Sequence, residues 1–147
     1  MYPDLMVVPM REELTRLGVQ EARTPEEVDA AIRKEKGTLL VVVNSICGCA
    51  AGKMRPAVRA ALQNAIRPDH SITVFAGQDI AATQRAREYF TDQPSSSPSI
   101  AILREGKLAF FMPRSEIESR DAGAIAASLR QAFEQVCRAT TNPRAST

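Results

Sequence analysis

The chain has 147 residues, of which 44% are hydrophobic, and this length and composition suit a single domain with its own core. Its 19 basic and 17 acidic residues are mixed along the chain and leave a formal net charge of +2, so no basic stripe predicts binding to nucleic acid. The chain has no apolar run as long as a membrane span and no secretory signal pattern at its start. We therefore expect a cytoplasmic protein with no nucleic-acid or membrane partner.

The first part of the chain predicts two helices. Residues 4–17 carry apolar residues at a rough helical period, which Pro9 should interrupt or kink. A short link over 19–23 follows. Thr24 then supplies an N-cap and Pro25 the first helical position of a second helix, with acidic residues in its first turn.

A strand–helix–strand unit follows. The run at 39–43 is apolar on both faces and rich in β-branched residues, which is typical of a central strand covered by helices on both sides. A helical pattern covers about 49–66, and Pro56 within it predicts a kink. A second strand is expected over 71–77, so the unit should be a right-handed parallel βαβ crossover.

A third helix is expected after the second strand. Asp79 can cap it, and it should run to about Phe90. The residues expected to face inward are Ile80, Thr83, Ala86 and Phe90. A polar loop with two prolines over 91–98 then separates this helix from the last strands.

The C-terminal part predicts an antiparallel hairpin and a final helix. Strands at 99–103 and 108–112 flank a turn that contains Gly106. The apolar face of the last helix is formed by Ile125, Leu129, Ala132, Phe133 and Val136. The pattern as a whole predicts one three-layer α/β domain over 1–138 and a disordered tail over 139–147.

Two thiols separated by one glycine, Cys47-Gly48-Cys49, follow the predicted central strand just where a helical pattern begins. The free N–H groups and the positive dipole end of that helix would favour the thiolate of Cys47, which makes Cys47 the expected nucleophile. A disulfide to Cys49 would close a small ring, which needs the sharp bend that Gly48 permits. Such a ring is strained and easily reduced, so the pair predicts redox chemistry.

Other interpretations of the reactive residues stay open. Inert burial of the two thiols is one, and a soft-metal clamp that adds Cys137 is another, although a structural zinc site needs four ligands and the chain has one histidine. Lys53 and Arg55 are interpreted as a solvated helix face, and His70 as a solvated turn residue. Cys137 is interpreted as a buried thiol, and its pairing with the other two cysteines stays open.

The sequence closely resembles the bacilliredoxin family from about residue 2 to residue 137. The segments that carry the resemblance are 41–52 with its Cys-Gly-Cys block, 55–57, 73–79, 86–90 and 96–101. One departure is Ser115, which stands where family members tend to have a histidine. The resemblance implies a thioredoxin-like three-layer α/β/α sandwich with a central mixed sheet.

The resemblance also implies an activity and a set of site residues. The activity is bacterial thiol–disulfide exchange that removes a low-molecular-weight thiol of the bacillithiol type from mixed disulfides on cytosolic client proteins, with no metal and no cofactor beyond the small thiol. Cys47 matches the attacking cysteine and Cys49 the resolving one. Pro98 matches the thioredoxin-type cis-proline, so Gly48, Ser97 and Pro98 are the expected substrate-binding residues. From the residues alone, the Ser97–Pro98 bond would default to trans.

Three rival functions remain at this point. The first is a general protein disulfide reductase or isomerase, which differs in client rather than in chemistry. The second is a metal or cluster delivery module built on the Cys-Gly-Cys pair, with Cys137 as a further ligand. The third is a binding protein on a thioredoxin-like scaffold whose thiols are unused.

Overall fold

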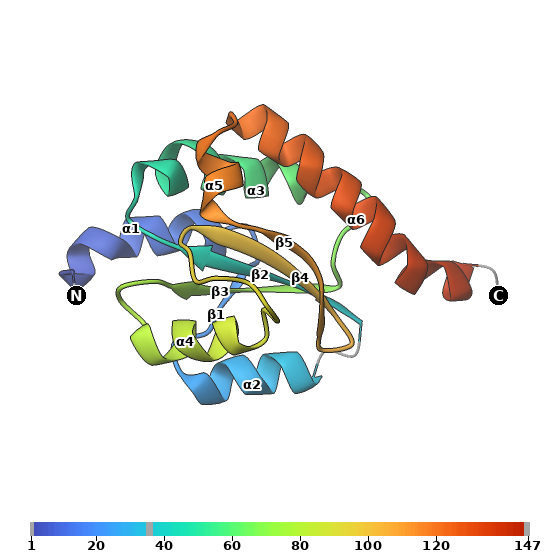
Figure 1. Cartoon of the computed structure of the whole chain (residues 1–147), viewed down its shortest axis with the longest axis horizontal. Helices are drawn as coiled ribbons and strands as arrows, with labels where there is room; N and C mark the ends of the chain where they lie inside the picture. The colour runs from blue at the N-terminus through green and yellow to red at the C-terminus, as the bar shows by residue number, and fades with distance from the viewer. Residues whose placement is uncertain (1, 35–36, 146–147) are drawn as a thin grey trace.

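A computed structural model describes residues 2–34 and 37–145 (Figure 1). Its elements in chain order are α1 (Asp4–Thr15), β1 (Gln20–Glu21), α2 (Pro25–Lys34), β2 (Thr38–Asn44), the π-helix η1 (Ala50–Met54), α3 (Arg55–Ala61), β3 (His70–Phe75), α4 (Ile80–Glu88), β4 (Ser99–Arg104), β5 (Lys107–Met112), α5 (Arg114–Glu118) and α6 (Ala122–Ala145).

The five strands form one mixed sheet with the order β1-β3-β2-β4-β5. The central strand, β2, pairs with β3 in parallel and with β4 in antiparallel orientation. All seven residues of β2 are buried, as the uninterrupted apolar run predicted. The βαβ unit, the hairpin and the mixed sheet are therefore confirmed.

Helices cover both faces of the sheet (Figure 1). Leu40 and Val42 pack into the core beneath α3 and α6, whereas Leu39, Val41 and Val43 pack into the core beneath α2 and α4. The alternation follows from the pleat, which sends successive side chains to opposite faces. The chain thus forms the three-layer α/β/α sandwich that was predicted.

Several predicted local signals act as expected. Gly18 ends the first helix with φ +93°, a left-handed conformation that glycine adopts without steric cost. Glu105 and Gly106, with φ 52° and 77°, form the tight turn of the hairpin. The Glu27 N–H donates to Thr24 Oγ1 at 3.1 Å, which confirms the N-cap of α2.

The helix after the thiols differs from the prediction. It does not extend to residue 66, since α3 ends at Ala61. The π-helical turn of η1 directly precedes Pro56, and in it the Arg55 N–H donates to the Ala50 carbonyl five residues back. Because proline has no N–H to donate, a wider turn just before Pro56 accommodates the missing hydrogen bond.

The start of α4 also differs from the prediction. Asp79 holds the N-cap position but makes no capping hydrogen bond with its side chain. Its carboxylate instead accepts two hydrogen bonds from the buried guanidinium of Arg11, at 2.8 and 2.9 Å. A buried cation needs a counter-ion, and this need outweighs the cap. Ile80, expected to face inward, is 60% exposed.

Two short elements and the length of the last helix were not predicted. Strand β1 has two residues and helix α5 has five, both too short to show a period in the sequence. The backbone of α6 is helical to Ala145, where the sequence predicted a disordered tail. Residues 146–147 lie outside the described part of the chain. Within the described ranges, no helix is both long and apolar enough to span a membrane.

Replacement of a central core leucine tests the assignment of the core. Leu40→Ala should lower the free energy of unfolding by about 2–5 kcal/mol, because Leu40 is fully buried in β2 and the substitution leaves a cavity between the sheet and α3. The matched control is Leu5→Ala on α1, where the leucine is 90% exposed, and its effect should stay within about 0.5 kcal/mol. Urea unfolding measures both, and similar losses in the two variants would contradict the assignment.

Candidate active site

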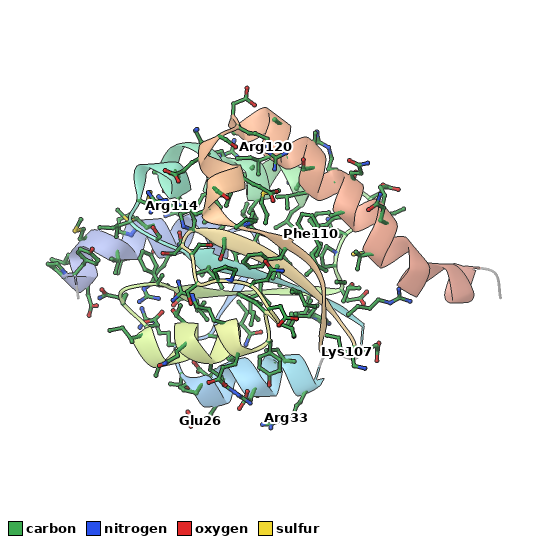
Figure 2. The ribbon with its side chains drawn as sticks, viewed as in Figure 1. Glu26, Arg33, Lys107, Phe110, Arg114 and Arg120 are labelled. Atoms are coloured by element: carbon green, nitrogen blue, oxygen red, sulfur yellow. The ribbon has the colours of Figure 1, made fainter. Side chains whose placement is uncertain are left out.

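Four connections meet at one end of the sheet. Strands β2 and β3 run in parallel, so both end there, and the connections that follow them carry Cys47 and Gly77. Strand β4 runs the other way and starts there, directly after Ser97–Pro98. Strand β5 is antiparallel to β4, so it ends there and leads to Arg114 at the start of α5, labelled in Figure 2. The topology therefore brings together segments that are up to about 70 residues apart in sequence.

A pocket of about 350 Å³ lies between these connections. Its lining residues are Tyr2, Ser45, Ile46, Cys47, Ala76, Gly77, Arg87, Ser97 and Arg114. Cys47 is therefore placed at a pocket together with Ser97, as the sequence predicted. Cys49 is not among the lining residues, so the two thiols have different surroundings.

The Cys47 sulfur lies at the start of a helix and accepts a hydrogen bond from it. The Cys49 N–H donates to Cys47 Sγ at 3.4 Å, and the Cys47 N–H donates to Ser45 Oγ at 2.8 Å. Burial alone would raise the pKa of Cys47. Hydrogen bonds from Cys49 and Ala50 and the positive charge of Arg114 outweigh burial, so the pKa of Cys47 lies below the usual cysteine value.

Cys49 has the opposite properties. Its side chain packs against the core cluster beneath α3 and α6. Burial raises its pKa, and so do the hydrogen bond and the negative charge of the neighbouring Cys47. At neutral pH the pair thus consists of a thiolate-prone Cys47 and a protonated Cys49. Both cysteines are free thiols in this structure.

Arg114 connects the thiols to the loop before β4. Its backbone N–H donates to Ser96 Oγ at 3.2 Å, and its Nη1 donates to the Ser97 carbonyl at 3.3 Å. Its Nε pairs with Glu118 at 3.2 Å, and Glu118 and the Cys47 charge both raise the pKa of Arg114. The sequence did not predict a role for Arg114, because no local signal marks its position beside Cys47.

A buried arginine holds the loop that leads to Cys47. Arg55 is 2% exposed, which shows that its interpretation as a solvated residue is wrong. Its Nη1 donates to Asn44 Oδ1 at 2.9 Å and to the Ser45 carbonyl at 3.0 Å, and its Nε pairs with Glu13 at 3.1 Å. Because these contacts satisfy the charge, Arg55 can stay buried and fix the end of β2.

The three predicted substrate-binding residues lie at this end of the sheet. Ser97–Pro98 is a cis peptide bond, where the residues alone favoured trans and the family resemblance favoured cis. Pro98 is buried and Ser97 is half-buried at the pocket. Gly48 is exposed in a helical turn and has no left-handed φ, and a Cβ added there would meet nothing within 4 Å, so this dithiol form does not use the bend that glycine was expected to permit in a disulfide. Their roles toward substrate stay predictions.

Cys137 lies far from the other two cysteines. It is buried, which raises its pKa to about 11, partly countered by a hydrogen bond with Thr38 at the start of β2. Cys47 follows the other end of this seven-residue strand, so about 20 Å separates them at ~3.3 Å per residue. Pairing of Cys137 with the dithiol does not occur in this fold. Lys53 donates to the Glu118 carbonyl at 2.5 Å. His70 is exposed as predicted, but it begins strand β3 rather than lying in a turn.

Solved structures of thioredoxins share this architecture. The oxidised thioredoxin of Plasmodium falciparum matches with a TM-score of 0.54 and 13% identity, covering 81% of this chain and 98% of that one. Oxidized thioredoxin O2 of Arabidopsis thaliana matches with a TM-score of 0.52 and 14% identity, covering 80% and 96%. At these identities the likeness shows the fold alone. Together with the dithiol at a helix start, this thioredoxin-like fold defines a thiol–disulfide oxidoreductase.

Sequence comparisons narrow the class to a family. A family model described as "Disulphide isomerase" matches residues 2–137. A protein named bacilliredoxin from Koribacter versatilis is 60% identical over 144 residues, covering 98% of this chain and 99% of its own length. A bacilliredoxin from Geobacillus kaustophilus is 49% identical over 137 residues, covering 93% of each. The chain belongs to the bacilliredoxin family.

Removal of the Arg114 charge tests the electrostatics of Cys47. Arg114→Met should raise the pKa of Cys47, because the thiolate loses a nearby positive charge. The thiolate is the reactive form, so the rise of alkylation rate with pH should move to higher pH and the rate at neutral pH should fall. Iodoacetamide kinetics followed by peptide mass spectrometry measure this at Cys47. Arg59→Met, on the exposed face of α3, is the control, and identical pH profiles in both variants would contradict the prediction.

Proposed function

We propose that this oxidoreductase reduces mixed disulfides between cytosolic bacterial proteins and a low-molecular-weight thiol of the bacillithiol type. The observation that supports this best is the unequal dithiol. Cys47 lines a pocket and has a lowered pKa, whereas Cys49 packs against the core and has a raised one. A volume of about 350 Å³ is at the small end of the range for small-molecule sites, which suits a small thiol beside Cys47.

The first step exchanges one disulfide for another. The Cys47 thiolate attacks the sulfur of the small thiol, so that a bond forms between these two sulfurs and the bond to the client sulfur breaks. The electron pair of the broken bond leaves with the client sulfur, which departs as a thiolate and takes up a proton from water. The client is thereby reduced, and the small thiol is carried on Cys47.

The second step releases the small thiol. Cys49 loses its proton to water as it attacks Cys47, the bond between Cys47 and the small thiol breaks, and the small thiol leaves as a thiolate. Burial of Cys49, which does not depend on the state of Cys47, keeps the pKa of Cys49 raised and slows this step, so the adduct on Cys47 persists after the client has left. The resulting Cys47–Cys49 disulfide is then reduced by external thiols of the same chemical class, which are oxidised to their own disulfide.

General disulfide reduction or isomerisation is the second candidate, and the description of the matching family model favours it. The sulfur chemistry is the same, but the client would carry protein disulfides rather than small-thiol adducts. Reactivation of a scrambled protein without any small thiol would support this candidate. A metal module built from all three cysteines finds no support in the fold, because β2 separates Cys137 from the pair.

Substitution of each cysteine tests the proposed roles. The substrate is a peptide whose cysteine carries bacillithiol, and its release is followed by mass spectrometry. Cys47→Ser should lower the release rate by at least about a hundredfold, because the attacking thiolate is lost. Cys49→Ser should still release the peptide and should accumulate bacillithiol on Cys47, because the resolving thiol is lost.

The control is Cys137→Ala, which removes a buried thiol about 20 Å away at ~3.3 Å per strand residue and should leave the release rate within about twofold. Full activity of Cys47→Ser would overturn the proposed mechanism. Absence of the adduct in Cys49→Ser would show that the small thiol is not transferred to Cys47.

A further inference from the structure

The pocket beside Cys47 is lined by two positive charges and no acidic side chain. Among the residues that the structure describes, the charged lining residues are Arg87 from α4 and Arg114 from α5, and the only other titratable groups that line the pocket are Cys47 and Tyr2. The two arginines reach the pocket from opposite layers of the sandwich. Both hold the loop before β4, since Arg87 Nη2 donates to the Ser96 carbonyl at 3.3 Å and Arg114 Nη1 to the Ser97 carbonyl at 3.3 Å.

The charges of the two arginines are balanced differently. Arg114 has Glu118 and the Cys47 thiolate as counter-charges. Arg87 forms no ion pair with any described residue, and its single described side-chain hydrogen bond goes to a neutral carbonyl. Its Nε is buried and has no hydrogen-bond partner within the described chain. Burial lowers the pKa of Arg87, which shows that its environment disfavours the positive charge.

A half-buried guanidinium without a counter-ion costs free energy in the unliganded protein. An unpaired surface lysine would avoid this cost by moving into solvent, but Arg87 is fixed by its bond to Ser96. An anionic group bound in the pocket would supply the missing counter-ion. The planar guanidinium suits a carboxylate in particular, because its parallel N–H groups match the two carboxylate oxygens.

We propose that Arg87 is a specificity-determining residue that binds a carboxylate on the low-molecular-weight thiol while its sulfur is exchanged with Cys47. This inference rests on the proposed function and names the chemical class of its substrate, a small thiol that carries a carboxylate. When the small thiol is transferred to Cys47, the sulfur of the small thiol lies at this pocket. The carboxylate belongs to the small thiol, so it stays with the protein when the client leaves. Arg114 remains the residue that faces the thiolate.

The test uses two mixed disulfides on the same peptide. One carries 3-mercaptopropionate and the other 3-mercaptopropionamide, which has the same skeleton without the charge. The rate of peptide release from the carboxylate substrate is divided by the rate from the amide substrate. This ratio is then divided by the same ratio measured with 2-mercaptoethanol in place of the protein, which corrects for the different intrinsic reactivity of the two disulfides. For the unaltered protein, we expect a corrected ratio on the order of ten, the usual effect of one charge-assisted hydrogen bond.

Two substitutions of Arg87 and one control locate the effect. Arg87→Met should bring the corrected ratio close to one, and Arg87→Lys should keep part of the preference because it keeps the charge. Arg59→Met removes an exposed arginine from α3 and should leave the ratio as in the unaltered protein. Because each ratio compares two substrates on one protein sample, a partly unfolded variant does not alter it. A ratio of one in the unaltered protein, or a ratio unchanged in Arg87→Met, would overturn the inference.

A second pair of substrates separates the small thiol from the client. Here the small thiol is the neutral amide, and the peptide has Glu or Gln beside its cysteine. The inference requires that Arg87→Met leaves the ratio of release rates from the Glu and Gln peptides unchanged. If Arg87→Met instead removed a preference for the Glu peptide and left the carboxylate-to-amide ratio unchanged, Arg87 would recognise the client and the inference would be overturned. Failure of the proposed function gives a different result, which is the absence of Cys47-dependent release from either small-thiol substrate.

Discussion

The register of β2 with its two neighbours determines where every residue of the site lies. Parallel pairing with β3 and antiparallel pairing with β4 bring the C-terminal ends of β2 and β3 and the start of β4 to the same end of the sheet. The hairpin adds the C-terminal end of β5. A strand buried along all seven residues cannot slip by one residue without turning its side chains to the wrong layer. The buried Arg55 then fixes the loop beyond Asn44. The position of Cys47 is therefore set by the pairing of β2 and by the buried contacts of Arg55 as well as by its own hydrogen bonds.

The two thiols are made unequal by their surroundings rather than by their sequence spacing. Cys47 receives hydrogen bonds from the start of the helix and faces Arg114, whereas Cys49 faces the apolar core. These conditions favour attack by the first thiol and delay the second. The start of the helix thus stabilises the Cys47 thiolate and also places Cys49 against the apolar core, which favours the protonated form of Cys49.

The sequence reveals the elements whose signals are local. The central strand has an uninterrupted apolar run, the hairpin has a turn glycine, and the dithiol stands between a strand and a helix, so all three can be recognised from short segments. Arg114 and Arg87 cannot, because their place beside Cys47 depends on pairing between strands distant in sequence. The prediction that Arg55 is solvated was wrong for a related reason. A charged helix residue is normally exposed, and only the tertiary contacts to Asn44 and Glu13 allow its burial.

The positive lining of the pocket has a consequence for the catalytic cycle. When Cys47 is a thiolate, its negative charge offsets part of the charge of the two arginines. Any disulfide at Cys47 removes that negative charge, so the pocket becomes more positive each time the protein is oxidised. The small anionic thiol proposed as the reductant would then be attracted most strongly in these oxidised states, which require reduction, and less strongly once the thiolate is restored. The oxidation state of a single sulfur atom would thereby control when such a donor is attracted and when it is released.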